Sequence, residues 1–215
     1  MDNINLNGVC SKTIFGLNPI IIILIFCMLI TFPISGRTQT TVVDLDGNQY
    51  STVCFGSQIW MAQNLRTKHK LNGETIESFN YLNDTANEPK YGRLYSWNAA
   101  MDGSSKESSQ GICPSGWHLP SDDEWNILID FLGGQDQAGK ALRIYSSTSF
   151  LQYLGGNYYP DIKAFSYIDQ QTYFWTSSMF NGSVAWIRNI GLKNSNINRS
   201  TVNKKFCFSI RCLKN

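Results

Sequence analysis

Of the six cysteines in the chain, the four that follow the N-terminal segment restrict how it can fold more than any other feature. They are Cys54, Cys113, Cys207 and Cys212. In an exported protein, an even number of cysteines indicates disulfides, and four cysteines allow three connectivities. A metal site is the weaker interpretation, because the sequence has no C-x-x-C pair and its two histidines lack ligand spacing. Whether the chain is exported therefore decides how the cysteines are interpreted.

The N-terminal segment predicts export. An apolar run extends from Ile20 to about Ile34. It is short for a membrane span, which needs about 20 apolar residues, and it has the length of the apolar part of a signal peptide. We expect a signal peptide over residues 1–38 and a single domain over residues 42–215. An uncleaved anchor and a lipid on Cys27 are the alternatives.

The composition indicates one globular domain. The chain has 215 residues, of which 42% are hydrophobic, 13% aromatic and only 16% charged, and its net charge is +2. That length is enough to bury a core. A nucleic-acid-binding domain would carry a strongly basic surface, and this balance predicts none. We therefore expect no nucleic-acid partner, and membrane contact only through the signal segment.

The stretch GICPSGWHLPSDDEW holds many residues that could do chemistry, but its pattern is structural. Ser121 is followed three residues later by Glu124, which is the spacing of a capping box at the start of a helix. We expect this helix to run to about Leu132, with Trp117 and Trp125 buried. Earlier in the chain, a hairpin is expected to turn at Asp46-Gly47-Asn48, and residues 94–101 show helical spacing.

Strand geometry narrows the disulfide pairing. The C-terminal sequence KFCFSIRCLKN alternates like a strand, so Cys207 and Cys212 would lie roughly 16 Å apart at about 3.3 Å per residue. A disulfide needs Cα atoms within about 7 Å, so these two should not pair. Cys54 and Cys207 each lie on the face opposite apolar neighbours. If the first and last strands are neighbours, we expect a Cys54–Cys207 bridge.

Five motifs in order give the chain a family resemblance. They are IWMAQNLR, YGRLYSWNAA, CPSGWHLPSDDEW, YFWTSS and FSIRC, between about Val42 and Leu213. The chain thereby resembles the Fibrobacter succinogenes major paralogous domain family, whose members look like exported or surface proteins of Bacteroidetes-type bacteria. The resemblance implies an α+β, C-type-lectin-like fold, with two helices, paired N- and C-terminal strands and a long loop-rich region. It also implies a Cys113–Cys212 disulfide, since both match the family's own cysteines.

The resemblance does not bring an activity with it. The tripeptides that hold calcium in C-type lectins are broken here, in NEPK and in SWNA, so we expect no metal. The fold is related to the formylglycine-generating enzyme, which looks to need a reactive cysteine pair near the C-terminal region. Cys207 and Cys212 correspond to that reactive cysteine pair only in that they lie near the C-terminus. His118 has no motif partner for a catalytic triad, and a hydrogen-bonded structural histidine is expected. We predict no catalytic residue and no cofactor.

A binding module is the function that we expect. Tyrosines cluster between residues 158 and 173, and tyrosine suits contact surfaces because it offers large area at low entropic cost. The candidate contact residues are Tyr158, Tyr159, Tyr173, Asn194, Asn196 and Asn198, with the asparagines on one face of an expected strand. Core tyrosines and a solvated polar strand are the alternatives. Thr85, within Asp-Thr-Ala, resembles a bacterial O-glycosylation signal.

The function predicted from the sequence is therefore an exported, non-enzymatic module that recognises a surface protein or glycan. It would act in the periplasm, at the cell surface or outside the cell. A formylglycine-generating-type oxidoreductase and a structural envelope or adhesin component are the alternatives.

Overall fold

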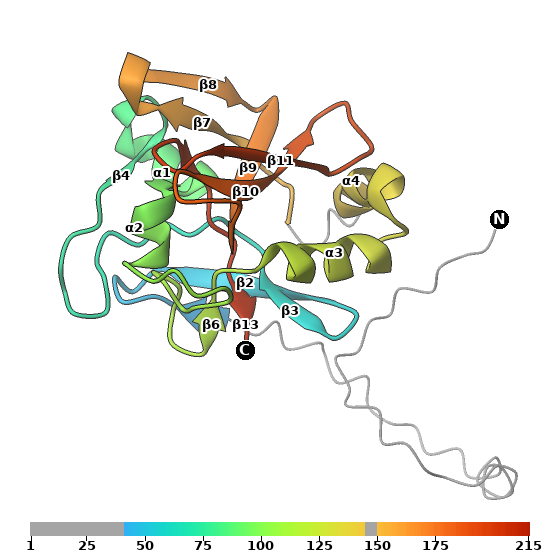
Figure 1. Ribbon diagram of the computed structural model, residues 1–215, viewed down its shortest axis with the longest axis horizontal. Coiled ribbons are helices and arrows are strands. Elements are labelled where there is room, and N and C mark those ends of the chain that lie inside the picture. The colour runs from blue at the N-terminus through green and yellow to red at the C-terminus, as the bar shows by residue number, and fades with distance from the viewer. Residues whose placement is uncertain (1–40, 145–149) are drawn as a thin grey trace, which may run out of the picture.

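The computed structural model describes residues 41–144 and 150–215, and the expected signal segment lies outside them. The domain is α+β and consists mostly of sheet, as expected. Figure 1 shows two groups of strands, with α3 and α4 beside them and α2 on the other side of the molecule. In the described part of the chain, no helix is both long and apolar enough to cross a membrane.

The first sheet joins the two ends of the domain. Its five strands are ordered β1-β2-β3-β13-β6, and every pairing is antiparallel. The predicted hairpin is confirmed, with Gly47 at a φ of 79° in the turn, a conformation that glycine adopts without steric cost. The strands are β1 (Thr41–Val43), β2 (Gln49–Phe55), β3 (Gln58–Met61), β6 (Trp117–His118) and β13 (Leu213–Lys214).

The second sheet is larger. Its main path runs in the order β11-β10-β9-β7-β12-β5-β4, and β8 pairs with β7 off that path. The strands are β4 (Ser78–Phe79), β5 (Leu94–Ser96), β7 (Gly155–Tyr159), β8 (Ala164–Ile168), β9 (Gln171–Met179), β10 (Val184–Gly191), β11 (Asn198–Asn203) and β12 (Cys207–Phe208).

The helices are short. The longest are α3 (Asp122–Phe131) and α4 (Gln135–Ile144), with ten residues each, and α1 (Glu88–Tyr91) and α2 (Trp97–Met101) are single turns. The helix expected over residues 94–101 is therefore only partly correct, because its first three residues form β5. Single 3-10 turns occupy Tyr81–Asn83, Thr85–Asn87 and Pro160–Ile162.

The interpretation of the GICPSGWHLPSDDEW stretch is confirmed. Ser121 is the N-cap of α3, and the reciprocal hydrogen bonds of a capping box with Glu124 are both present. Leu132 is the C-cap, and Trp117 and Trp125 are buried. The acidic residues at this helix start therefore have structural roles, because Glu124 accepts from the Ser121 N–H, Asp122 pairs with Arg188 and Arg199, and their charges favour the positive end of the helix dipole.

One of the two expected disulfides is present. Cys113 and Cys212 are bonded, with a Cα–Cα distance of 6.0 Å. The expected Cys54–Cys207 bridge is wrong, because both residues are free cysteines. The C-terminal segment is not one strand: Cys207 lies in β12 of the second sheet, and the chain joins the first sheet only at Leu213. Cys54 lies in β2, opposite Ile59 of β3, so the two cysteines belong to different sheets.

Candidate functional site

The tyrosines that we expect to contact a ligand lie in two different environments, one in the core and one at the surface. Tyr158 is buried, and its ring packs against the rings of Phe79 and Phe165 at 4.3 and 4.5 Å. For Tyr158 the core alternative is therefore correct. Tyr159 and Tyr173 are half-buried and lie on the opposite side of the sheet, because successive residues of a strand point to opposite faces.

Aromatic contacts hold the half-buried tyrosines in place. The Tyr173 ring stacks on Phe208 at 5.2 Å, and the Tyr159 ring meets Phe206 edge-on at 4.7 Å. Tyr167, on β8, lies 6.2 Å from Tyr173 and is 42% exposed. Burial, and then the nearby Tyr159 and Tyr167, raise the pKa of Tyr173 to about 12. The phenol of Tyr173 is thus uncharged at neutral pH.

The backbone at Tyr167 is unusual. Its φ is 66°, in the left-handed region that bulky side chains rarely adopt. Such strain persists only where the surrounding structure holds it, and it concentrates at functional sites. The fold therefore presents this exposed ring at a conformational cost.

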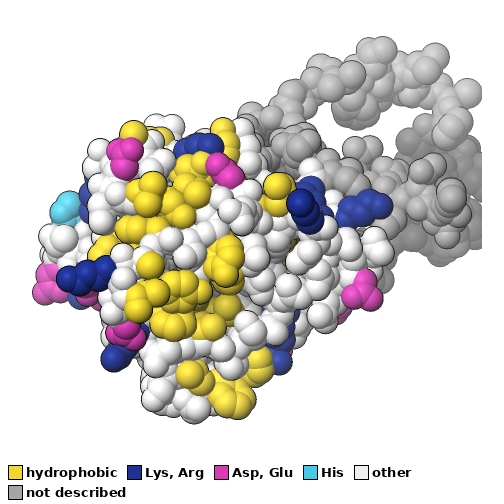
Figure 2. All heavy atoms as spheres, turned by 90° about the horizontal axis from the view of Figure 1, so that it is seen from above, with side chains coloured by type: hydrophobic (Ala, Val, Ile, Leu, Met, Phe, Trp, Pro, Cys, Tyr) yellow, Lys and Arg dark blue, Asp and Glu magenta, His cyan; other side chains and the backbone are white. Residues whose placement is uncertain are grey.

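Two asparagines extend the aromatic group across the sheet. Asn189 of β10 lies opposite both Tyr173 of β9 and Asn198 of β11, so the three side chains form one cross-strand row on the same face. We call this surface the tyrosine face; it consists of Tyr159, Tyr167, Tyr173, Asn189, Asn198 and Phe206. Seen from the side of β7, β8 and β11, hydrophobic side chains gather in neighbouring patches, with charged ones mostly around them (Figure 2).

The other predicted asparagines lie outside this row. Asn194 and Asn196 are in the turn before β11, so the expectation of three asparagines on one strand is wrong. The chain turns there, because the Asn194 N–H donates to the carbonyl of Gly191; Ile197, which follows, is fully buried and its N–H donates to the carbonyl of Gln135. Asn196 is linked to this row by a hydrogen bond, since its side-chain Nδ2 donates to Asn198 Oδ1 at 2.5 Å.

A cavity of about 230 Å³ adjoins the tyrosine face. Pro160, which follows Tyr159, and Lys205, which precedes Phe206, both line it, so the cavity meets the tyrosine face at the end of the sheet, while Phe79 and Cys207 place its wall on the Tyr158 side. Burial, and the nearby Glu77, raise the pKa of the Cys207 thiol to about 12. The other lining residues include Glu77, Phe79, Ser96, Asn98 and Lys204. The sequence did not indicate this cavity, because these residues come from four separate segments.

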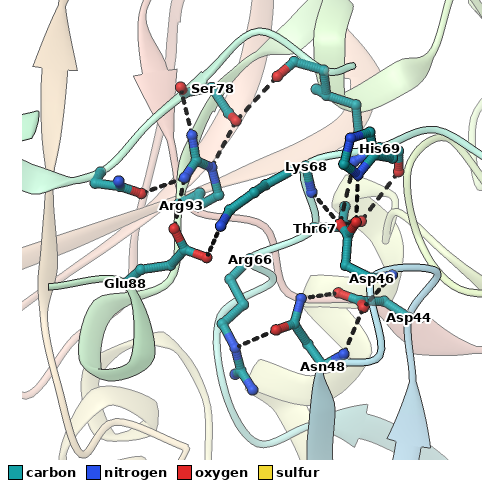
Figure 3. A network of polar contacts seen from close by, with 12 residues as sticks. Asp44, Asp46, Asn48, Arg66, Thr67, Lys68, His69, Ser78, Glu88 and Arg93 are labelled. Carbon is teal, nitrogen blue, oxygen red and sulfur yellow. Dashed lines mark hydrogen bonds and ion pairs between the residues drawn. The ribbon is translucent and has the colours of Figure 1, made fainter. Parts of the chain in front are cut away.

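A polar network holds the loop after β3 against the β1–β2 turn (Figure 3). The Asp46 carboxylate accepts hydrogen bonds from the Thr67 hydroxyl and the Lys68 N–H, and it contacts the His69 ring. Burial acts to raise the pKa of Asp46, but these contacts outweigh it and lower the pKa to about 2. The network's carboxylates are thus satisfied by the protein itself, which is the pattern of a scaffold.

Thr85 lies on the surface. It begins a 3-10 turn that the Asp84 side chain caps through the N–H of Ala86. Its side chain is exposed. Glycosylation at this position stays a prediction.

His118 has a structural environment, as expected. Its two ring nitrogens contact Glu124 at 2.9 Å and Asn215 at 2.6 Å. Burial acts to lower the pKa of His118, but these contacts outweigh it and raise the pKa. For Glu124, burial acts to raise the pKa, but the contacts with His118 and the Ser121 N–H lower it from 4.5 to about 2.

These opposite shifts predict a pH window for stability. A carboxyl with a lowered pKa stabilises the fold above its ordinary value of 4.5, and this is lost as pH falls towards 2. A histidine with a raised pKa stabilises below its ordinary 6.5, and this is lost as pH rises through the folded-state value. We expect Glu124→Gln to lower the free energy of unfolding by about 2 kcal/mol near pH 5.5, after discounting for solvent screening, and by less at pH 3. Urea unfolding at several pH values measures this; a pH-independent difference would contradict it.

The fold and the site define an α+β module with a disulfide between a central loop and the last strand, and with an aromatic, amide-rich sheet face beside a small cavity. The chain belongs to the family described as the Fibrobacter succinogenes major domain, whose model matches residues 53–214. No curated protein matches the chain. No solved structure matches it either.

Proposed function

We propose that the protein is an exported, non-enzymatic binding module that recognises a protein or glycan on a surface through the tyrosine face. The observation that carries the proposal is the cross-strand row of Tyr173, Asn189 and Asn198, with Tyr159 and Tyr167 beside it. Aromatic rings supply contact area and the amides supply hydrogen bonds, which is the composition of binding surfaces in general.

The tyrosine face is also pre-organised. The rings of Tyr159 and Tyr173 are already packed on Phe206 and Phe208, so a ligand would not have to order them. Ordering a free side chain at an interface costs roughly 0.5–1.5 kcal/mol. A rigid, uncharged surface of this kind favours recognition of a partner over chemistry on one.

The free thiol of Cys207 meets one requirement of the oxidoreductase alternative, but other observations speak against it. Cys212, the second cysteine of the expected pair, is bonded to Cys113. Thiol chemistry needs the thiolate, and the raised pKa of Cys207 keeps this thiol protonated at neutral pH. No specific contact favours a purely structural role.

The same proposal includes a more specific fold for the domain and a location outside the cytoplasm for the protein. We propose a C-type-lectin-like fold related to that of the formylglycine-generating enzyme. Pairing of β13 with β3 closes the domain ends, and a long segment rich in loops separates β3 from α3. Export to the periplasm, the cell surface or the medium is supported by the Cys113–Cys212 disulfide, since such bonds persist in oxidising compartments.

The test combines a glycan array with a pull-down from envelope proteins, using the full-length chain. We expect Tyr167→Ala and Tyr173→Ala each to weaken binding of the captured ligand about tenfold or more, because tyrosines at the centre of an interface commonly contribute over 1 kcal/mol. Tyr153→Ala is the matched control: this half-buried tyrosine packs on Tyr91, outside the tyrosine face. Equal binding by all three variants would refute the proposal.

A further inference from the structure

We propose that the cavity beside the tyrosine face binds a single uncharged sugar ring, with hydroxyls on Glu77, Asn98 and Lys205 and a C–H face against Phe79. The inference rests on the proposed function and narrows its ligand to a glycan. It is carried by the size of the cavity, by three solvent-exposed polar side chains that line it and contact no other described polar group, and by its fixed aromatic wall.

The size of the cavity limits the ligand. Sites for drug-sized molecules usually enclose about 300–1,000 Å³, whereas this cavity encloses about 230 Å³. That is room for one small ring rather than for a folded peptide segment or a nucleotide. A larger ligand would therefore place only one unit in the cavity.

The polar lining suits hydroxyl groups. Glu77, Asn98 and Lys205 line the cavity and are exposed to solvent, and their side chains make no hydrogen bond or ion pair with another described residue, so a ligand could replace the water around them. The carboxylate only accepts, the ammonium only donates and the amide does both. A sugar hydroxyl can donate and accept, so neighbouring hydroxyls of one ring can satisfy all three groups.

The charges of the lining favour an uncharged ligand. Glu77 and Lys205 supply one charge of each sign. The second lysine, Lys204, is already engaged, because its ammonium donates to the carbonyl of Gly182 at 3.2 Å and lies 4.2 Å from the centre of the Trp97 ring. Lys204 keeps its charge, but its ammonium is held by these contacts, so the two charged groups left to meet a ligand, Glu77 and Lys205, balance each other. A zwitterion such as an α-amino acid also balances these charges and is the competing ligand.

The apolar wall distinguishes a sugar from an α-amino acid. The Phe79 ring is held by its contact with Tyr158 at 4.3 Å, and Pro160 lies at the edge next to Tyr159. A sugar ring has an apolar C–H face that can pack on such a wall, whereas a small amino acid has little to place there.

Saturation-transfer NMR on the full-length chain tests the inference. The probes are the methyl glycosides of glucose, galactose, mannose and N-acetylglucosamine, with glycine, glutamate and lysine as the amino-acid arm. We expect at least one glycoside and none of the amino acids to bind. Glu77→Gln and Asn98→Ala should each weaken that binding about tenfold or more. Glu107→Gln, an exposed glutamate outside the cavity, should leave it unchanged.

The possible failures are distinguishable. Binding of the amino acids alone, of no probe, or of a glycoside with equal affinity by the cavity variants and the wild type would overturn the sugar site. If the Tyr167 and Tyr173 variants still lose their captured ligand in those cases, the proposed function stands without it. If the cavity variants lose glycoside binding while the tyrosine variants keep every ligand, the sugar site stands and the tyrosine face fails.

Discussion

Replacing both Cys113 and Cys212 with alanine should lower the free energy of unfolding by about 4 kcal/mol. The two cysteines are 99 residues apart, and in the chain-entropy model a bridge over about 100 residues restricts the unfolded chain by up to about 4.7 kcal/mol. Both residues are buried in the core between the loop that leads to β6 and the last strand. A loss of this size is a large part of the 5–15 kcal/mol that typically stabilises a domain.

Chemical denaturation of the full-length chain, with the disulfide intact and in the double variant, measures the effect. Cys54→Ser is the control, because Cys54 is a half-buried free thiol; we expect it to change the free energy of unfolding by less than about 1 kcal/mol. Equal stability of the double variant and the wild type would show that the fold holds these segments together without the bond. Peptide mapping under non-reducing conditions checks the pairing itself.

What could be predicted from the sequence is mostly what depends on residues close together in the chain. The capping box needs only Ser121 and Glu124, three residues apart, and the β1–β2 hairpin needs only its Asp46-Gly47-Asn48 turn. Both are confirmed. The Cys113–Cys212 disulfide is long-range, and it came from the family resemblance rather than from the pattern of the strands.

The errors share one physical cause. Alternation within a strand tells which face a side chain occupies, but not which strand or sheet lies opposite. Cys54 and Cys207 were therefore paired across a ladder that does not exist, because the chain changes sheets between Phe208 and Leu213. Likewise, nothing near Tyr158 in the sequence shows that Phe79 will cover it. The cavity is the extreme case, since its lining residues come from four separate segments of the chain.

We expect Arg211→Met to lower the free energy of unfolding by about 3–5 kcal/mol. The side chain is buried and forms no ion pair with any described residue. It donates instead to the carbonyls of Ala62 at 2.7 Å and Phe150 at 3.0 Å, and to the Asn64 side chain at 2.5 Å. Its guanidinium also lies 4.4 Å from the centre of the Phe150 ring. Burial lowers its pKa to about 9, so it is still charged at neutral pH.

Two effects oppose each other in this substitution. Methionine removes a charge whose burial is unfavourable, which by itself would stabilise the fold. It also leaves two buried carbonyls and the Asn64 amide oxygen without donors, and each unsatisfied group costs about 1–3 kcal/mol. The second effect should prevail, because one planar guanidinium serves all of these acceptors, and the Met61 carbonyl at 3.4 Å as well. Arg211→Lys keeps the charge but loses the planar arrangement of several N–H donors, so it should also destabilise the fold.

Denaturation midpoints measure both variants, with Arg66→Met as a control at a half-buried arginine over Tyr50. An Arg211→Met variant as stable as the wild type would mean that relief of the buried charge outweighs the lost hydrogen bonds.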